Sequence, residues 1–259
     1  MKFRFTVGLF GCCLGLALLA TPVVSFAGSH VSLIVPTQVP SDDQTALLKV
    51  ASNEQEKLEV RVAAVTKLTD QSMLGQIADV SKDARLRLVA VKELTDQALL
   101  GKVATQDSDP ALRMAATRKL TDQYLLGLVA TRDTRSGIRL TAVRMLTDQS
   151  LLGQAAIDDK DTTIRLVATK HLTDQSLLGQ VILWDKDARV RLIAVKKLTD
   201  QYLLGKVAAG DKETSIRLIA IGKMTDQSVL IKLAESESPQ EVRKAATDRL
   251  ESLRSGKPN

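Results

Sequence analysis

Hydrophobic and polar positions along this chain follow a pattern that recurs every 26 residues between residues 69 and 250. In the copy at 95–120, four apolar residues fall on one face of a short helix: Leu99, Leu100, Val103 and Ala104. A polar break follows at 106–109, and apolar residues then return at i, i+4 and i+8: Leu112, Ala116 and Leu120. The pattern therefore predicts two short amphipathic helices in each copy, the second running from 110 to 120.

The ends of these helices carry recognisable start signals. Thr-Asp-Gln opens each copy, with the aspartate at Asp70, Asp96, Asp122, Asp148, Asp174, Asp200 and Asp226. Either the threonine or the aspartate can accept hydrogen bonds from the free N–H groups of the first helical turn. In the second helix, Asp109 occupies the N-cap position and Pro110 the first helical position, where proline is tolerated. We therefore interpret Thr-Asp-Gln as a helix start and not as a functional motif.

Helices of about ten residues are marginal alone in water, so each pair must bury its apolar face against neighbouring pairs. The predicted fold is all-α, an α-solenoid of stacked helix-turn-helix repeats. We expect an N-terminal cap at 42–68, seven repeats at 69–250 and a closing helix that runs to 254. At the C-terminal end, Ile231 replaces a repeated glycine and Lys244 a repeated leucine, as a terminal cap requires. We expect residues 28–41 to form an extended lead and residues 255–259 a tail, and we expect a monomer.

Residues 1–27 have the parts of a secretory signal peptide: a basic start, an apolar run and the small-residue site Ser25-Phe26-Ala27. Two alternatives are a lipoprotein signal, with Cys12 or Cys13 acylated, and an uncleaved anchor. Cleavage predicts an exported bacterial protein, periplasmic or secreted, with no spanning segment left.

Cleavage would also change the composition of the chain. Both cysteines and all four phenylalanines lie in the signal segment, so three aromatic residues remain: Tyr124, Trp184 and Tyr202. The formal charge falls from +6 to +4, because the segment carries Lys2 and Arg4 and no acid. So small a basic excess does not indicate nucleic-acid binding.

In five copies an aspartate stands six residues before an arginine that follows an apolar residue: Asp107/Arg113, Asp133/Arg139, Asp159/Arg165, Asp185/Arg191 and Asp211/Arg217. This motif, placed between two helices, resembles that of the short HEAT-like repeats of bacteria. Repeats of this kind are also found in bilin-attachment proteins. The motif is also similar to the leucine-rich variant repeat, which would make one element of each unit a 3₁₀ segment. The HEAT-like resemblance implies a structural ladder of arginines and aspartates that ties the repeats together: Arg87, Arg113, Arg139, Arg165, Arg191 and Arg217.

Two other repeated features concern packing and charge. Single glycines fall inside the first helix of six copies, which predicts that two helix backbones approach closely there: Gly75, Gly101, Gly127, Gly153, Gly179 and Gly205. Basic residues gather at the end of the second helix, among them Lys196, Lys197 and Lys223. Stacking would align them into a stripe along one edge, with acids at the opposite edge near the turn. The stripe either offsets helix dipoles or attracts an anionic partner.

A binding surface should appear where the copies differ, because stacking constrains the shared positions. The end of the first helix varies most, and in the middle copies it becomes apolar: Ile157, Ile182, Leu183 and Trp184. Trp184 is the best candidate for a binding hot spot, although it could instead cover a gap between helices. Tyr124 and Tyr202 replace a small residue in the first helical turn and are further contact candidates.

The sequence contains few residues of the types that commonly act in catalysis. The two histidines are His30, in the lead, and His171, at a variable position, and no His/Cys/Asp set has metal-ligand spacing. We expect no catalytic residue, cofactor or metal. The leading hypothesis is an exported scaffold that binds a protein or peptide along one face. The alternatives are an anionic cell-envelope component bound by the basic stripe, and a purely structural spacer.

Overall fold

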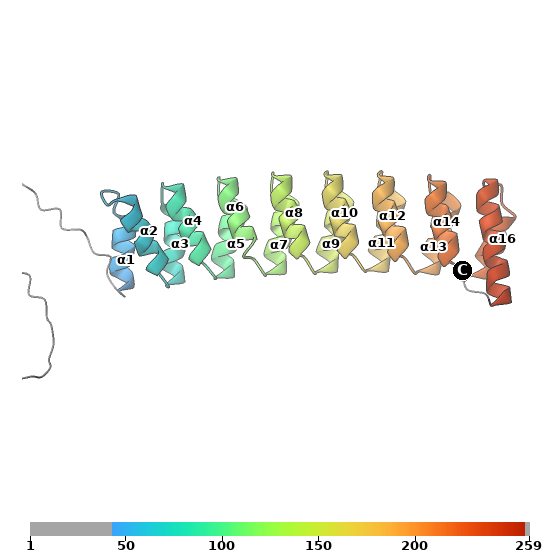
Figure 1. The fold of residues 1–259 in the computed structure, drawn as a ribbon, viewed down its shortest axis with the longest axis horizontal. Helices are drawn as coiled ribbons and strands as arrows, with labels where there is room; N and C mark the ends of the chain where they lie inside the picture. The colour runs from blue at the N-terminus through green and yellow to red at the C-terminus, as the bar shows by residue number, and fades with distance from the viewer. Residues whose placement is uncertain (1–42, 257–259) are drawn as a thin grey trace, which may run out of the picture. The chain divides into compact units, whose positions relative to one another are not determined.

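The computed structural model describes residues 43–256, a range that contains sixteen α-helices and no strand (Figure 1). The predicted signal peptide, the lead and the end of the tail lie outside this range. The helices are α1 (Gln44–Ser52), α2 (Leu58–Lys67), α3 (Gln71–Val80), α4 (Ala84–Glu93), α5 (Gln97–Gln106), α6 (Pro110–Thr117), α7 (Gln123–Arg132), α8 (Ser136–Met145), α9 (Gln149–Asp158), α10 (Thr162–His171), α11 (Gln175–Trp184), α12 (Ala188–Lys197), α13 (Gln201–Gly210), α14 (Thr214–Lys223), α15 (Gln227–Ala234) and α16 (Gln240–Ser255).

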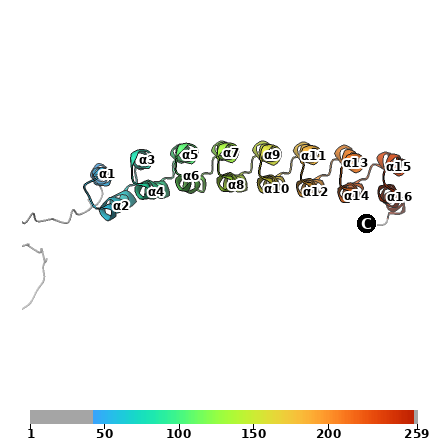
Figure 2. The same cartoon turned by 90° about the horizontal axis from the view of Figure 1, so that it is seen from above.

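The helices form two rows, with the odd-numbered helices in one and the even-numbered helices in the other (Figure 2). Each odd-numbered helix packs against the even-numbered helix that follows it, and each row is continuous from one repeat to the next. Helices of the even row lie closer to one another than helices of the odd row. This arrangement is an α-solenoid, and both elements of each unit are α-helices.

Aspartates cap both helices of a typical repeat. The side chain of Asp96 accepts a hydrogen bond from the Leu99 N–H (2.9 Å), and that of Asp109 accepts one from the Ala111 N–H (2.8 Å). The second helix is slightly shorter than its apolar pattern predicts, because α6 ends at Thr117 while Leu120 is fully buried beyond it. A side chain in the loop after a helix can be buried in the core just as one in the last helical turn can. The apolar pattern alone therefore places the C-terminal end of this helix beyond its true position.

The core is built from the same positions in every repeat. Each odd-numbered helix contributes a fully buried leucine, as Leu126 does in α7, and each even-numbered helix a fully buried alanine, as Ala142 does in α8. The alanines are too small to hold neighbouring helices apart, since the distance between packed helices depends on the side chains at the contact. The hydrophobic core therefore continues through the whole array.

The repeated glycines correct one prediction, because what approaches them is a side chain and not a backbone. A Cβ atom added to Gly127 would lie 2.7 Å from the Leu151 side chain, and one added to Gly153 would lie 2.7 Å from Leu177. In each case the leucine belongs to the next odd-numbered helix. The same pairing holds from Gly75 to Gly179, and Val229 takes the leucine's place opposite Gly205. Each glycine is thus the socket for an apolar side chain of the following repeat.

The glutamine of Thr-Asp-Gln joins consecutive repeats, a role that the sequence did not suggest. The Gln149 Oε1 atom accepts hydrogen bonds from the Thr173 N–H (2.6 Å) and the Asp174 N–H (3.2 Å) of the next repeat. Its Nε2 atom donates to the Thr147 carbonyl of its own repeat (3.3 Å). We call this series the glutamine ladder: Gln44, Gln71, Gln97, Gln123, Gln149, Gln175 and Gln201.

Gln149→Ala should lower the free energy of unfolding by about 1 kcal/mol, because it leaves two backbone N–H groups without their acceptor. Urea denaturation followed by circular dichroism would measure the change. Gln227→Ala is the matched control, because Gln227 also follows a capping aspartate but no further Thr-Asp-Gln follows it in the chain. Equal effects of the two substitutions would contradict a role for Gln149 between repeats.

Candidate functional site

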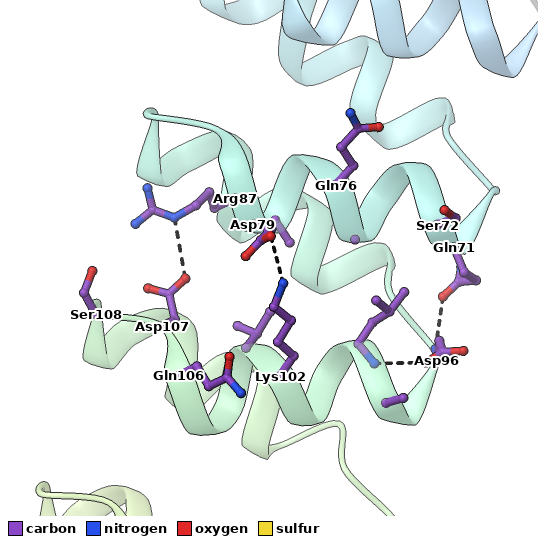
Figure 3. Close-up of a pocket in the computed structure, with 15 residues that line it drawn as sticks. Gln71, Ser72, Gln76, Asp79, Arg87, Asp96, Lys102, Gln106, Asp107 and Ser108 are labelled. Atoms are coloured by element: carbon purple, nitrogen blue, oxygen red, sulfur yellow. Dashed lines mark hydrogen bonds and ion pairs between the residues drawn. The ribbon is translucent and has the colours of Figure 1, made fainter.

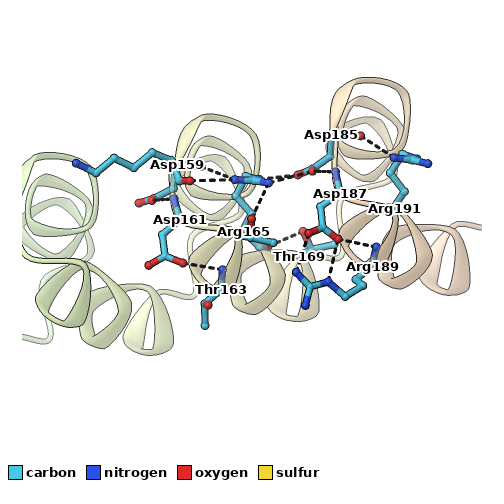
Figure 4. A network of polar contacts seen from close by, with 11 residues as sticks. Asp159, Asp161, Thr163, Arg165, Thr169, Asp185, Asp187, Arg189 and Arg191 are labelled. Atoms are coloured by element: carbon cyan, nitrogen blue, oxygen red, sulfur yellow. Dashed lines mark hydrogen bonds and ion pairs between the residues drawn. The ribbon is translucent and has the colours of Figure 1, made fainter.

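Arginines and aspartates form a second series of contacts between repeats, at the opposite end of the odd-numbered helices (Figure 4). Arg165 in α10 donates from Nε to Asp185 Oδ2 (2.7 Å) and from Nη2 to Asp185 Oδ1 (3.2 Å), and its Nη1 donates to the Asp159 carbonyl (2.9 Å). Each guanidinium thus binds the main chain of its own turn and the carboxylate of the next. We call this the arginine ladder: Arg113–Asp133, Arg139–Asp159, Arg165–Asp185 and Arg191–Asp211.

The two outer members of the predicted arginine series bind differently. Arg87 lies 3.7 Å from Asp107 and donates to the Ser81 carbonyl (3.0 Å). Arg217 donates to the Ala208 carbonyl and to the Ser238 hydroxyl, both at 2.8 Å, because Glu237 takes the place of the repeated aspartate. The bidentate ion pairs are therefore confined to the middle of the array.

The arginine ladder changes the protonation of its carboxylates. Burial is the largest single effect on the pKa of Asp133 and of Asp159, and it raises both values. Hydrogen bonds from Arg113 and Arg139 lower them. Hydrogen bonds from main-chain N–H groups and the attraction of the arginine charges act in the same direction. Both pKa values consequently lie below the usual value for aspartate, and both arginine pKa values are raised.

These lowered pKa values predict acid sensitivity. A carboxylate with a folded-state pKa below its unfolded-state value of about 3.9 stabilises the fold fully above that value. This stabilisation is lost as the pH falls through the folded-state pKa. We therefore expect the urea midpoint to be nearly constant from pH 7 to 5 and to fall below pH 4. Asp133→Asn, whose side chain cannot ionise, should be less stable than the wild type at pH 7 but should lose less stability on acidification. A urea midpoint that falls with pH in parallel with that of the wild type would contradict this.

The middle repeats bring Leu183, Trp184 and Ile157 to one surface, which we call the Trp184 surface. Trp184, the last residue of α11, is 78% exposed, and Leu183 is 44% exposed. Ile157 is partly buried and lines one groove together with Trp184. Ile182 is only 2% exposed and belongs to the core, so it is removed from the predicted patch. With most of its surface in solvent, the indole does not fill a gap between helices.

The two tyrosines lie away from this surface. Tyr124 and Tyr202 are 70% and 69% exposed, in the first turns of α7 and α13, whereas Trp184 ends its helix. The Lys206 ammonium lies 4.6 Å from the centre of the Tyr202 ring, which is a cation–π contact. The structure therefore does not bring the tyrosines and Trp184 into one patch.

Several lysines of the predicted basic stripe are engaged inside the protein. Lys223 Nζ donates to the Val195 carbonyl (3.0 Å), and Lys197 Nζ donates to the Thr169 carbonyl (3.4 Å) and to that of Lys170. Burial lowers the pKa of both ammonium groups. These two lysines cap the C-terminal end of the preceding even-numbered helix. Lys196, by contrast, is exposed.

Charges at the opposite edge also differ from the expectation. The ladder aspartates point inward, and the side chains of Asp185 and Asp211 are each 3% exposed. The exposed residues of the middle turns between paired helices include three lysines: Lys160, Lys186 and Lys212. We call these the turn lysines. They were not among the predicted contact residues, although their positions are related by the 26-residue period.

A groove of about 1000 Å³ lies between α3 and α5 (Figure 3). Its charged groups already have partners: Lys102 is 2.8 Å from Asp79, and Arg87 is paired with Asp107. Along this groove Gln71 Oε1 accepts a hydrogen bond from the Asp96 N–H (3.0 Å) as part of the glutamine ladder. We attribute its size to the wider spacing of the odd row and not to a ligand site.

Two general features of residues 43–256 bear on function. No helix in this range combines the length and the apolar character that crossing a membrane requires. No group of three or more His, Cys, Asp or Glu side chains in this range is arranged to hold a metal ion.

Comparison with known proteins gives little further information. No family model matches the chain, and no curated protein matches its sequence. Among solved structures it is similar to the X-ray structure of YibA from Escherichia coli, a structural genomics target. The two share 15% sequence identity, the match covers 80% of this chain and 92% of YibA, and the TM-score is 0.40.

Proposed function

We propose that this protein is a non-enzymatic, exported scaffold of the short HEAT-like type that binds a protein or peptide through the Trp184 surface. The observation that carries the proposal is the 78% exposure of Trp184 at the end of α11. The copies on either side place Asp158 and Gly210 at this position. Most of the Trp184 side chain lies in solvent beside Leu183, and its burial by a partner would be favourable.

The basic stripe supports the alternative, an anionic envelope component, less well. Lys197 and Lys223 already donate to main-chain carbonyls, so binding an anion would require them to leave a neighbouring helix. Three exposed lysines in the last turns of even-numbered helices also belong to the stripe and remain free to act in this way: Lys92 in α4, Lys170 in α10 and Lys196 in α12. A pure spacer would not need the Trp184 surface.

The test is affinity capture from a cell-envelope extract by the purified protein and by Trp184→Ala. We expect Trp184→Ala to weaken binding of the captured partner by about 30-fold, which corresponds to a hot spot of about 2 kcal/mol. Tyr124→Ala is the matched control, because it removes an aromatic side chain of similar exposure on another helix.

Circular dichroism should show equal folding of both variants. Equal binding by wild type, Trp184→Ala and Tyr124→Ala would contradict the proposal. Loss of binding in the triple variant Lys92→Gln/Lys170→Gln/Lys196→Gln alone would favour the anionic component.

A further inference from the structure

The turn lysines lie in the same part of the array as the Trp184 surface. Lys160, Lys186 and Lys212 occupy one repeat position in three consecutive turns, and Trp184 ends the helix before the middle turn. The same position is Ser108, Thr134 or Ser238 in other copies. Lys82 also occupies it, but there the ammonium is paired with Glu54 (3.2 Å). Lysines without an ion-pair partner at this position therefore coincide with Trp184 in the same part of the array.

Acidic groups nearby do not cancel this positive charge. None of the ion pairs within residues 43–256 involves a turn lysine. The ladder aspartates are buried against arginines, and Asp187 is bound by Arg189, which holds the pKa of Asp187 at about 2. The exposed acids that remain nearby are Asp158 and Glu213. Asp161 is partly exposed and also has no ion-pair partner in this range, so four exposed lysines, Lys206 included, outnumber three acids.

Two small grooves flank the Trp184 indole. One, of about 270 Å³, is lined by Ile157 and Trp184 together with Lys160 and Lys186. The other, of about 240 Å³, is lined by Leu183, Trp184 and Gly210 together with Lys186, Lys206 and Lys212. Gly210 leaves this second groove open, because a Cβ atom added there would meet nothing within 4 Å. Each groove thus combines an apolar wall with lysines, and the first is also lined by the exposed Asp158.

We infer that this surface binds an acidic peptide segment that carries a large apolar residue. The inference rests on the proposed function and specifies the partner's chemistry. Charge complementarity with the lysines favours acidic side chains, and the grooves beside the indole favour an apolar one. Grooves on both sides of a protruding ring accept individual side chains, which a flat lipid surface does not provide.

The repeat spacing sets the expected pattern of the segment. Packed helices lie about 8 to 10 Å apart, so successive turn lysines are separated by about that distance. A segment in the polyproline II conformation advances about 3.1 Å per residue and turns once in about three residues, so one repeat corresponds to about three residues on the same side of the segment. Acidic side chains near positions i, i+3 and i+6 would each meet one turn lysine. A segment of about seven residues is sufficient.

Selection of a random dodecapeptide display library on the purified protein tests this inference. Enriched sequences are expected to have a net negative charge and a Leu, Phe or Trp. Synthesised peptides can then be titrated against the protein. Trp184 is the only tryptophan of the chain, so a blue shift of its emission reports binding at this surface. Peptides without tryptophan keep this signal specific.

Lys160→Gln/Lys186→Gln/Lys212→Gln should weaken the selected peptides at least tenfold. Gly210→Gln, which fills one groove without adding charge, should also weaken them. The triple variant Lys92→Gln/Lys170→Gln/Lys196→Gln removes the same charge from the other edge and should bind within twofold of wild type. Circular dichroism melting confirms that each variant folds.

The inference is overturned if no peptide is enriched, if the enriched peptides lack an acidic excess, or if the turn-lysine variant binds as wild type. Anionic phospholipid vesicles that bind with the same lysine dependence, while no peptide binds, would also overturn it in favour of a lipid surface. Peptide binding that needs Trp184 but not the lysines would leave the proposed function standing. Binding that needs neither would contradict both.

Discussion

Arg165→Ala is expected to lower the free energy of unfolding by about 3 to 5 kcal/mol, because it leaves a buried carboxylate without its partner. Arg165 is 4% exposed and the Asp185 side chain 3% exposed, and the two form a bidentate ion pair. The substitution also removes the donor to the Asp159 carbonyl. The loss should spread beyond one repeat, because each repeat is stabilised mainly by its neighbours.

Urea denaturation measured by circular dichroism gives the overall change, and Trp184 emission gives the change beside Asp185. Arg87→Ala is the matched control, because Arg87 occupies the same repeat position but lies 3.7 Å from Asp107, with a side chain 16% exposed. We expect it to cost about 1 kcal/mol, in the range of a weak ion pair. An equal loss in the free energy of unfolding at both positions would show that the bidentate ion pair adds no stability beyond that of the weaker pair.

A double variant separates the cost of a stranded charge from the value of the ion pair. Arg165→Met/Asp185→Leu replaces both charges by apolar side chains and should recover most of the stability that Arg165→Ala loses. Failure to recover would mean that the main-chain hydrogen bonds of Arg165 dominate its contribution.

Gly127→Leu is expected to destabilise the array by about 3 kcal/mol through overpacking. Even a single Cβ atom at Gly127 would lie 2.7 Å from the Leu151 side chain, so the larger side chain must displace that leucine from its socket. The expected result is a lower urea midpoint and a lower melting temperature.

Two variants make this prediction specific. Gly127→Leu/Leu151→Ala moves the large side chain to the other helix and should recover part of the loss. Gly137→Ala lies in α8, where an added Cβ atom meets nothing within 4 Å. It should leave stability unchanged or raise it by about 0.5 kcal/mol. A Gly127→Leu variant as stable as the wild type would contradict the conclusion that Gly127 is needed to accommodate the Leu151 side chain.

Most of the fold followed from local chemistry. The 26-residue period, the capping aspartates and the apolar faces specify helix starts and core positions, because these depend on neighbours within a few residues. The arginine ladder was anticipated from the HEAT-like resemblance. The bidentate partner of each arginine nevertheless lies twenty residues ahead, in the next turn, as Asp185 does for Arg165. A pattern within one repeat does not specify that offset.

Other roles depend on how far one repeat is shifted along the next. Gly127 meets Leu151, Gln149 binds Thr173 and Lys223 binds the Val195 carbonyl, and each contact joins residues about 24 to 28 positions apart. Helical periodicity orients a side chain around its own helix axis but carries no information about that shift. The glutamine therefore resembled a helix-start residue, and the lysine a free surface charge.

For the candidate site, the sequence alone was sufficient to identify Trp184 as a departure from the repeat and to place it at the end of a helix. Only the tertiary structure decided that the indole is exposed, that Ile182 beside it is buried, and that Lys160, Lys186 and Lys212 surround it. The physical reason is that exposure and local charge are properties of the stack. Burial of the ladder aspartates by arginines of the preceding repeats leaves the lysines as the main charge at that edge.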